Sequence, residues 1–310
     1  METLIDDKEI VIESGDLRLI VAPFGASLRG LQRRQSDGTY ADIVTSYTGR
    51  AAKMGGQGDV LIPFAGRIGY GKYEFGHRTH QMVKNDVEGP SAIHGFVRTK
   101  MWASEVVGNS VIFTTSFDAR ANEGYPFALG ITMKYTLTDD GLAVKFSIKN
   151  TGDDPAPVAA GFHPYFTVGS ALIDTDTLHV PFRSYLEYDS NLIATGVVKP
   201  VEGSPLDFRT PRTIGGTVFN VCYVDPIRDA DGILRIKLSH GDKNVTVWQD
   251  QTLNYAVLYS GDPMPESHRR KALAIEAMSC GSNAFNHSSW GLVALEPGET
   301  FSGTWGVTSE

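Results

Sequence analysis

Alternation between apolar and polar residues is the feature that most constrains the fold of this chain. Apolar side chains recur at every second position in residues 17–21, 131–137, 142–148 and 301–305. Successive side chains of a β-strand point to opposite faces, so a period of two is typical of strands with one buried face. Helical periodicity is hard to find. The pattern predicts an all-β protein.

Turn signals separate these runs. Adjacent aspartate and glycine residues stand at 37–38, 140–141, 152–153 and 231–232, and 33 glycines and 15 prolines are spread along the chain. Such spacing is typical of many tight turns and not of one flexible linker. Because no repeat or low-complexity tract is present either, we predict one domain over residues 1–310, a large antiparallel β-sandwich.

Charge and cysteine content narrow the class of protein. The chain has 310 residues, of which 41% are hydrophobic and 21% charged, and a net charge of −8. These values fit a globular protein and argue against nucleic acid or an anionic membrane as its partner. Cys222 and Cys280 are too few for a disulfide framework and lack the spacing of a metal site. Residues 1–8 lack the features of a signal peptide and no apolar run is long enough to span a membrane, so we expect a cytoplasmic enzyme or binding protein.

The glycine-rich stretch 51–59 is the least strand-like part of the chain. It lacks the Gly-Lys-Ser/Thr ending of a phosphate loop, and the glycine spacing of a dinucleotide site is also absent. The charged run 266–271 is interpreted as a solvated loop. Neither stretch indicates a nucleotide cofactor.

His163 stands among aromatic residues in the stretch 159–166 and precedes Pro164. A proline disfavours helical geometry for the residue before it, so His163 is expected to be extended. Its imidazole can exchange a proton near neutral pH, which suits the wall of a polar-ligand pocket. A packed core histidine explains the same pattern.

Two further stretches carry polar residues in an unusual context. Arg67 stands between apolar residues and glycines, where a guanidinium either pairs with a carboxylate or directs its donors into a pocket. His94 precedes Gly95, which allows close approach of a ligand or of another strand. Asn85 and Asp86 lie upstream of His94 in a connecting loop as possible hydrogen-bonding residues. The alternatives are a structural ion pair for Arg67, a structural role for His94 and turn chemistry for Asn85 and Asp86.

Glu276 is the most informative single residue. In a strand it would share one face with Ala272, Ala274 and Met278, and the small neighbours leave room beside its carboxylate. A carboxylate in an apolar strand is costly unless it is paired or hydrogen-bonded. Burial would raise its pKa toward the range of a general base at neutral pH. A buried structural ion pair is the alternative.

These residues could transfer protons on a neutral polar ligand. Neither a metal signature, a nucleophile elbow nor a cofactor fingerprint accompanies them, so we predict no metal and no cofactor. Glycoside hydrolysis would usually require a second carboxylate beside Glu276. Asp59, Asp225 and Asp250 remain open for that role.

Five short segments, in this order, resemble the aldose 1-epimerase (galactose mutarotase-like) family. They are Pro63–Ile68, Ala92–Gly95, Gly161–Phe166, Ile275–Met278 and Leu295–Glu299. The resemblance extends from about residue 58 to the end of the chain and implies a β-sandwich of the supersandwich type. In such enzymes a glutamate at the position of Glu276 is the general base and a histidine at the position of His163 is the general acid. An arginine and a histidine at the positions of Arg67 and His94 bind sugar hydroxyls.

Two positions depart from the family pattern. Gly66 stands where asparagine is common, and Asn220 aligns with an aspartate that binds sugar hydroxyls. Asparagine donates and accepts hydrogen bonds but carries no charge. Asp225, a few residues on, is an alternative substrate-binding residue. These changes concern the preferred sugar more than the reaction.

The resemblance implies an aldose 1-epimerase that interconverts the α and β anomers of a hexose by opening its ring. We expect a monomer or homodimer whose partner is a small sugar. A carbohydrate-binding protein without catalysis and a glycosidase are competing hypotheses. A third is an epimerase for a phosphorylated or sulfonated aldose, in which Arg98, Lys100 and residues 268–271 would supply cations.

Overall fold

The computed structural model describes residues 8–310, and β-strands dominate them. The helices of this part are four short 3₁₀ turns: η1 (Arg50–Ala52), η2 (Gly69–Gly71), η3 (Val97–Thr99) and η4 (Ile173–Thr175). None of the described helices has the length and apolarity needed to cross a membrane. The prediction about a signal peptide concerns a segment whose residues 1–7 lie outside the described part.

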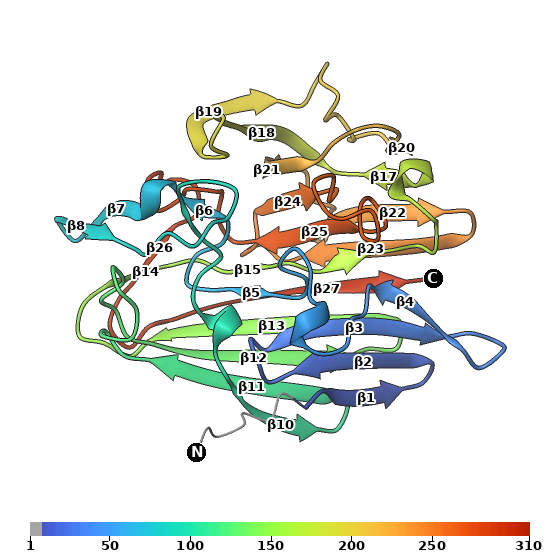
Figure 1. Cartoon of the computed structure of the whole chain (residues 1–310), viewed down its shortest axis with the longest axis horizontal. Coiled ribbons are helices and arrows are strands. Elements are labelled where there is room, and N and C mark those ends of the chain that lie inside the picture. Colours follow the sequence, from blue (N-terminus) through green and yellow to red (C-terminus); the bar gives the residue numbers. More distant parts are fainter. Residues whose placement is uncertain (1–7) are drawn as a thin grey trace.

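The larger sheet contains the strands that carry the candidate site (Figure 1). Its main path runs in the order β1 (Ile10–Ser14), β2 (Leu17–Ala22), β3 (Ser27–Arg34), β4 (Tyr40–Val44), β16 (Tyr165–Phe166), β25 (Leu273–Met278), β24 (Tyr255–Tyr259), β21 (Asn220–Pro226), β18 (Phe182–Tyr188) and β19 (Ala194–Pro200). Two short strands extend it beside β25, namely β15 (Gly161–Phe162) and β5 (Val60–Leu61). All of these pairings are antiparallel.

A second antiparallel sheet packs against the first. Its order is β10 (Ala103–Val107), β11 (Ser110–Phe117), β12 (Leu129–Leu137), β13 (Gly141–Asn150), β27 (Thr300–Ser309), β23 (Lys243–Gln249), β22 (Leu234–His240), β17 (Thr177–His179) and β20 (Arg212–Thr213). Three two-stranded ribbons complete the described part: β14 (Ala156–Val158) with β26 (Val293–Leu295), β6 (Arg67–Ile68) with β9 (Ala92–Ile93), and β7 (Lys72–Phe75) with β8 (Arg78–Gln81).

The predicted alternation is confirmed where it is clearest in the sequence. Along β12 every odd-numbered residue is buried, whereas the even-numbered residues are half-buried or exposed. The Asp-Gly signals at 37–38, 140–141 and 231–232 lie between strands or at a strand start, as expected for tight turns. The all-β prediction is therefore correct.

One hydrophobic core joins the two sheets. Phe162 of β15 packs against Trp305 of β27, with ring centroids 5.4 Å apart. The hydroxyl of Tyr135 on β12 donates a hydrogen bond of 2.6 Å to the carbonyl of Ala26, which precedes β3. A single cluster of buried apolar residues contains members of both sheets, so the architecture is the predicted β-sandwich. This shared core supports the single-domain prediction, which stays a prediction.

Candidate active site

His163 lies opposite Glu276 across an interruption in the larger sheet. Gly161 and Tyr165 pair with β25 on either side of this point, and the common register of the two pairings places His163 level with Glu276. Residues directly opposite each other in an antiparallel pair point to the same face of the sheet. The topology therefore brings together two side chains that are 113 residues apart, as the difference between 276 and 163 shows.

The interruption follows from the backbone of His163 and its neighbour. The N–H of His163 donates to the carbonyl of Asp59 at 3.0 Å, and its carbonyl accepts from the N–H of Gly58 at 2.9 Å. Pro164 has no N–H to offer to a neighbouring strand. The hydrogen bonds of His163 thus continue the pairing of β15 with β5, and the missing N–H of Pro164 accounts for the break in the ladder with β25.

The two side chains form a close and buried pair. His163 Nε2 lies 3.3 Å from Glu276 Oε1, and the side chains are 7% and 2% exposed. His163 Nδ1 and Glu276 Oε2 have no hydrogen-bond partner among residues 8–310. A proton donor and a proton acceptor with unused polar atoms in a shielded pocket meet the geometric requirement for general acid–base chemistry.

Burial moves the pKa values of the pair in opposite directions. It raises the pKa of Glu276 well above its ordinary value of 4.5, and the positive charge of Arg67 opposes this shift. Burial also lowers the pKa of His163 from 6.5 to about 3. Both residues therefore favour the uncharged form, because a buried charge loses its hydration. A single proton shared by the pair is therefore favoured on Glu276 over His163.

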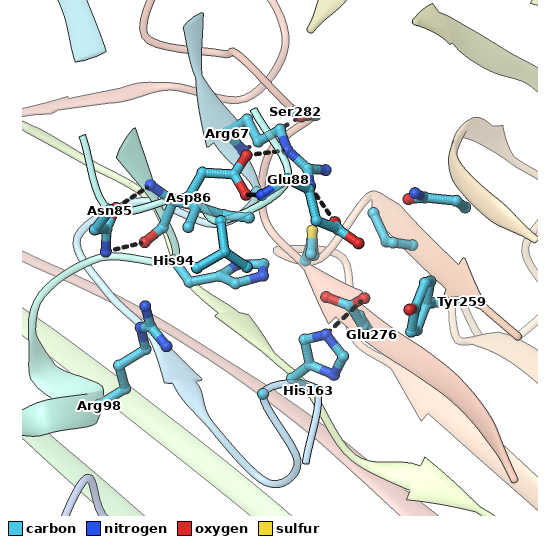
Figure 2. Close-up of a pocket in the computed structure, with 18 of the residues that line it drawn as sticks. Arg67, Asn85, Asp86, Glu88, His94, Arg98, His163, Tyr259, Glu276 and Ser282 are labelled. Carbon is cyan, nitrogen blue, oxygen red and sulfur yellow. Dashed lines mark hydrogen bonds and ion pairs between the residues drawn. The ribbon is translucent and has the colours of Figure 1, made fainter. Parts of the chain in front are cut away.

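The pocket above this pair has a volume of about 290 Å³ (Figure 2). Val257 of β24 pairs with Glu276, and Tyr259 of the same strand pairs with Asn220 of β21. All of these side chains line the pocket. The predicted residue Asn220 therefore lies on the floor that carries His163 and Glu276.

Arg67 both pairs with carboxylates and faces the pocket, the two roles between which its sequence context did not decide. Its Nε donates to Asp86 Oδ2 and its Nη2 to Glu88 Oε2, each at 2.7 Å. The side chain is 9% exposed and lines the pocket together with both carboxylates. Arg67 is thus held in an ion-pair network that forms one wall of the site (Figure 2).

Asn85 and His94 lie on the same side of the pocket as this network. The amide of Asn85 bonds the backbone of Ile93 twice, accepting from its N–H at 2.8 Å and donating to its carbonyl at 3.2 Å. The His94 ring meets the His163 ring edge to face, with centroids 5.5 Å apart. Burial, helped by the nearby His163, lowers the pKa of His94 well below its usual value, so this histidine is neutral. Both predicted residues line the pocket, and Asn85 also fixes the strand that leads to His94.

Asp225 lies away from these residues. It is exposed near the other end of β21, five positions from Asn220, or about 16 Å along an extended strand. It does not line the pocket.

The other two carboxylates considered as partners of Glu276 also lie outside the pocket. Asp59 lines the neighbouring cavity, and its buried carboxylate pairs with Lys53. Asp250 accepts from the N–H groups of Thr252 and Thr304 at 2.9 and 2.6 Å, a turn role that leaves it outside the site.

Residues 8–308 match the family model of aldose 1-epimerase. The chain belongs to the aldose 1-epimerase family. It is 27% identical to the uncharacterized protein YihR of Escherichia coli over 94% of this chain and 89% of that protein. It is 24% identical to a galactose mutarotase of Sus scrofa over 96% and 93% of the two chains. The crystal structure of an aldose epimerase homologue from C. elegans has the same fold, with a TM-score of 0.87, 20% identity and coverage of 98% of each chain.

One departure from the family pattern has a local cause in this aldose 1-epimerase family member. Gly66 has φ +68°, and a Cβ at this position would lie 3.1 Å from Ser282 Oγ. The Ser282 hydroxyl also lies 3.4 Å from the Arg67 N–H. A larger residue at 66 would therefore press on the serine that contacts the backbone of Arg67.

Sequence reasoning missed Glu88 and Tyr259 as lining residues. Glu88 lies two positions after Asp86, which itself was noted only as a loop hydrogen-bonding residue. An acidic pair in a loop downstream of Arg67 was a usable signal for the partners of this arginine. Tyr259 carries no such signal, because its place follows from the register of β24 with β21 and β25.

Proposed function

We propose that this protein is a mutarotase, an aldose 1-epimerase that interconverts the α and β anomers of a hexose. The observation that carries the proposal is the 3.3 Å contact between His163 Nε2 and Glu276 Oε1 at the floor of the pocket. Family membership supports a carbohydrate epimerase. The pair supports the chemistry, because opening a sugar ring requires one proton to leave and one to arrive.

The reaction starts from a pair that shares one proton. Transfer of that proton from Glu276 to His163 across their contact gives a carboxylate and an imidazolium. Glu276 then takes the proton of the anomeric hydroxyl while His163 donates its proton to the ring oxygen. The bond between C1 and the ring oxygen breaks, and C1 becomes an aldehyde. Rotation about the bond between C1 and C2 and closure from the other face, with the roles reversed, give the other anomer. Each assisted proton transfer contributes about 10²–10⁴-fold to the rate.

The remaining pocket residues orient the sugar. Arg67 and neutral His94 would hydrogen-bond to ring hydroxyls, and Asn220 would do so from the strand two away from Glu276. Asn85 acts mainly through Ile93, since both ends of its amide are occupied there. Correct docking is itself a source of rate, because it converts a chance encounter into a reactive geometry. The reaction as proposed moves only protons and therefore uses no cofactor.

Optical rotation tests this proposal. Freshly dissolved α-glucose and α-galactose should reach equilibrium rotation faster in the presence of the protein, in proportion to its concentration. A protein that binds these and other aldoses by calorimetry but accelerates the mutarotation of none would instead be a carbohydrate-binding protein. Release of reducing sugar from model glycosides would favour a glycosidase.

A further inference from the structure

The two carboxylates that pair with Arg67 differ in how fully they are engaged. Asp86, whose side chain is 3% exposed, accepts from Arg67 Nε through Oδ2 and from the Glu88 N–H through Oδ1, at 2.7 and 3.0 Å. The Glu88 side chain is 40% exposed, and within residues 8–310 only its Oε2 accepts a hydrogen bond. Buried Asp86 alone balances the charge of Arg67, so Glu88 adds a negative charge that this ion pair does not require.

Glu88 and Arg67 each keep one polar atom for a ligand. In the part of the chain that the structure describes, Glu88 Oε1 accepts from no donor and Arg67 Nη1 donates to no acceptor. Both residues line the pocket, and the 2.7 Å contact between Glu88 Oε2 and Arg67 Nη2 holds their side chains together. An acceptor and a donor held by one ion pair suit a sugar, because each hydroxyl can both donate and accept.

The Glu88 carboxylate faces the interior of the pocket. Figure 2 shows it between Arg67 on one side and Glu276 and Tyr259 on the other. Burial raises the pKa of Tyr259, and the negative charge of Glu88 adds to this rise. Because the field of a charge weakens with distance, this effect indicates that the carboxylate lies near the tyrosine. Glu88 therefore reaches the space above the catalytic pair, where the sugar would lie.

A spare carboxylate oxygen in this place would recognise a hydroxyl by its proton. A hydrogen bond to an ionised acceptor is about twice as strong as a neutral one. A site built around a hydroxyl also rejects an analogue without it, because the polar atom of the protein then stays unpaired. The spare oxygen of Glu88 thus has the chemistry of a residue that selects among sugars.

We propose that Glu88 is a specificity-determining residue, whose Oε1 accepts a hydrogen bond from one hydroxyl of the substrate sugar other than the anomeric hydroxyl. This inference rests on the proposed mutarotase function and adds a substrate contact to it. Asp86 is a positioning residue in this arrangement, because its carboxylate holds both the Arg67 side chain and the backbone of Glu88.

Exchange between anomers, measured by NMR magnetisation transfer, tests the inference. The substrates are whichever of glucose and galactose the protein turns over faster and its four monodeoxyfluoro derivatives, substituted at C2, C3, C4 or C6. Fluorine is close to a hydroxyl in size but donates no hydrogen bond, so one derivative lacks the proposed contact. The proteins are the wild type, Glu88→Gln, Glu88→Ala and Glu105→Ala. Glu105 is an exposed residue of β10, which lies at an edge of the second sheet and provides the matched control.

Each variant is compared with the wild type on the same sugar, which removes the effect of fluorine on the chemistry itself. For the parent sugar, Glu88→Ala should lower kcat/KM about 10- to 100-fold, as expected for a lost charge-assisted hydrogen bond. Glu88→Gln should lower it less, because its amide oxygen is still a neutral acceptor. For at least one fluoro derivative both losses should shrink to about threefold or less, whereas the remaining derivatives should keep them. Glu105→Ala should change nothing.

Two results would overturn the inference. One is a wild-type kcat/KM for the parent sugar in folded Glu88→Ala. The other is an equal loss on all five sugars, which would assign Glu88 to the support of Arg67 and not to a contact with the substrate. Failure of the wild type to exchange the anomers of either glucose or galactose would instead contradict the proposed function itself, so the two failures are distinguishable.

Discussion

Gly56 lies against the imidazole of His163, so closely that a Cβ on this glycine would stand 3.2 Å from His163 Cδ2. The loop that carries Gly56 also bonds the backbone of His163 through Gly58 and Asp59. The loop therefore fixes both the backbone and the ring of the proposed acid.

Gly56→Ala should reduce activity by displacing this ring. We expect kcat to fall about tenfold or more, because small misplacements of reacting groups are costly. The added Cβ also strains a backbone at φ +74° by about 1–2 kcal/mol. Gly203→Ala is the matched control, since Gly203 has φ +72° and open space around its Cβ position. Equal kinetics for the two variants would show that the contact with His163 does not matter.

The enzymatic activity should persist at pH values below the ordinary pKa of histidine. The pair is active when it carries one proton. It gains a second proton only as the pH falls through the pKa of His163, which burial lowers to about 3. The last proton is lost as the pH rises through the raised pKa of Glu276. A profile of kcat/KM against pH should therefore stay flat as the pH falls through 6.5, the ordinary histidine value, and should decline on the alkaline side. A half-loss of activity near pH 6.5 would contradict this assignment.

Glu276→Gln should stabilise the fold at neutral pH. Because the pKa of Glu276 is higher in the folded state than its ordinary 4.5, the unfolded chain ionises first and folding loses stability as the pH rises above 4.5. Glutamine removes this cost, so we expect a gain of about 0.5–2 kcal/mol in the free energy of unfolding. The gain should vanish at a pH below 4.5, where the carboxyl is protonated in both states. Urea unfolding at the two pH values measures it, and a loss of stability at neutral pH would contradict the burial argument.

Arg67→Met should destabilise the protein strongly. It leaves Asp86, whose side chain is 3% exposed, as a buried charge without its partner, at a cost of about 3–5 kcal/mol. Arg235 offers a matched control, because it also pairs with two carboxylates, at 2.7 and 2.6 Å, but on the surface. Arg235→Met should cost about 1 kcal/mol or less. Similar unfolding free energies for the two variants would show that the Arg67 network is not effectively buried.

More of the fold than of the site could be predicted from the sequence. Alternation and turn signals are local, so β12 and its turn were visible in the chain itself. Residue patterns alone indicated His163 and Glu276 only as separate candidates, and the family resemblance supplied their joint role. The register that places His163 level with Glu276 depends on pairings with β25, which no local pattern contains. Asp225 was a reasonable neighbour of Asn220 in sequence, but an extended strand carries it away from the pocket. The raised pKa of Glu276 was expected from its apolar strand, whereas the lowered pKa of His163 follows from a burial that its local sequence left open.

The central claim is that His163 and Glu276 act as one proton-sharing pair. The most direct test compares the initial rate of change in optical rotation of the preferred sugar for Glu276→Gln, His163→Asn and the double variant, each verified as folded by circular dichroism. We predict that each single change lowers kcat by about 10²–10⁴-fold. The double variant should be no slower than the worse single variant, because residues that act as a unit have non-additive effects. A wild-type rate in folded Glu276→Gln, or a double-variant loss equal to the product of the single losses, would contradict the claim.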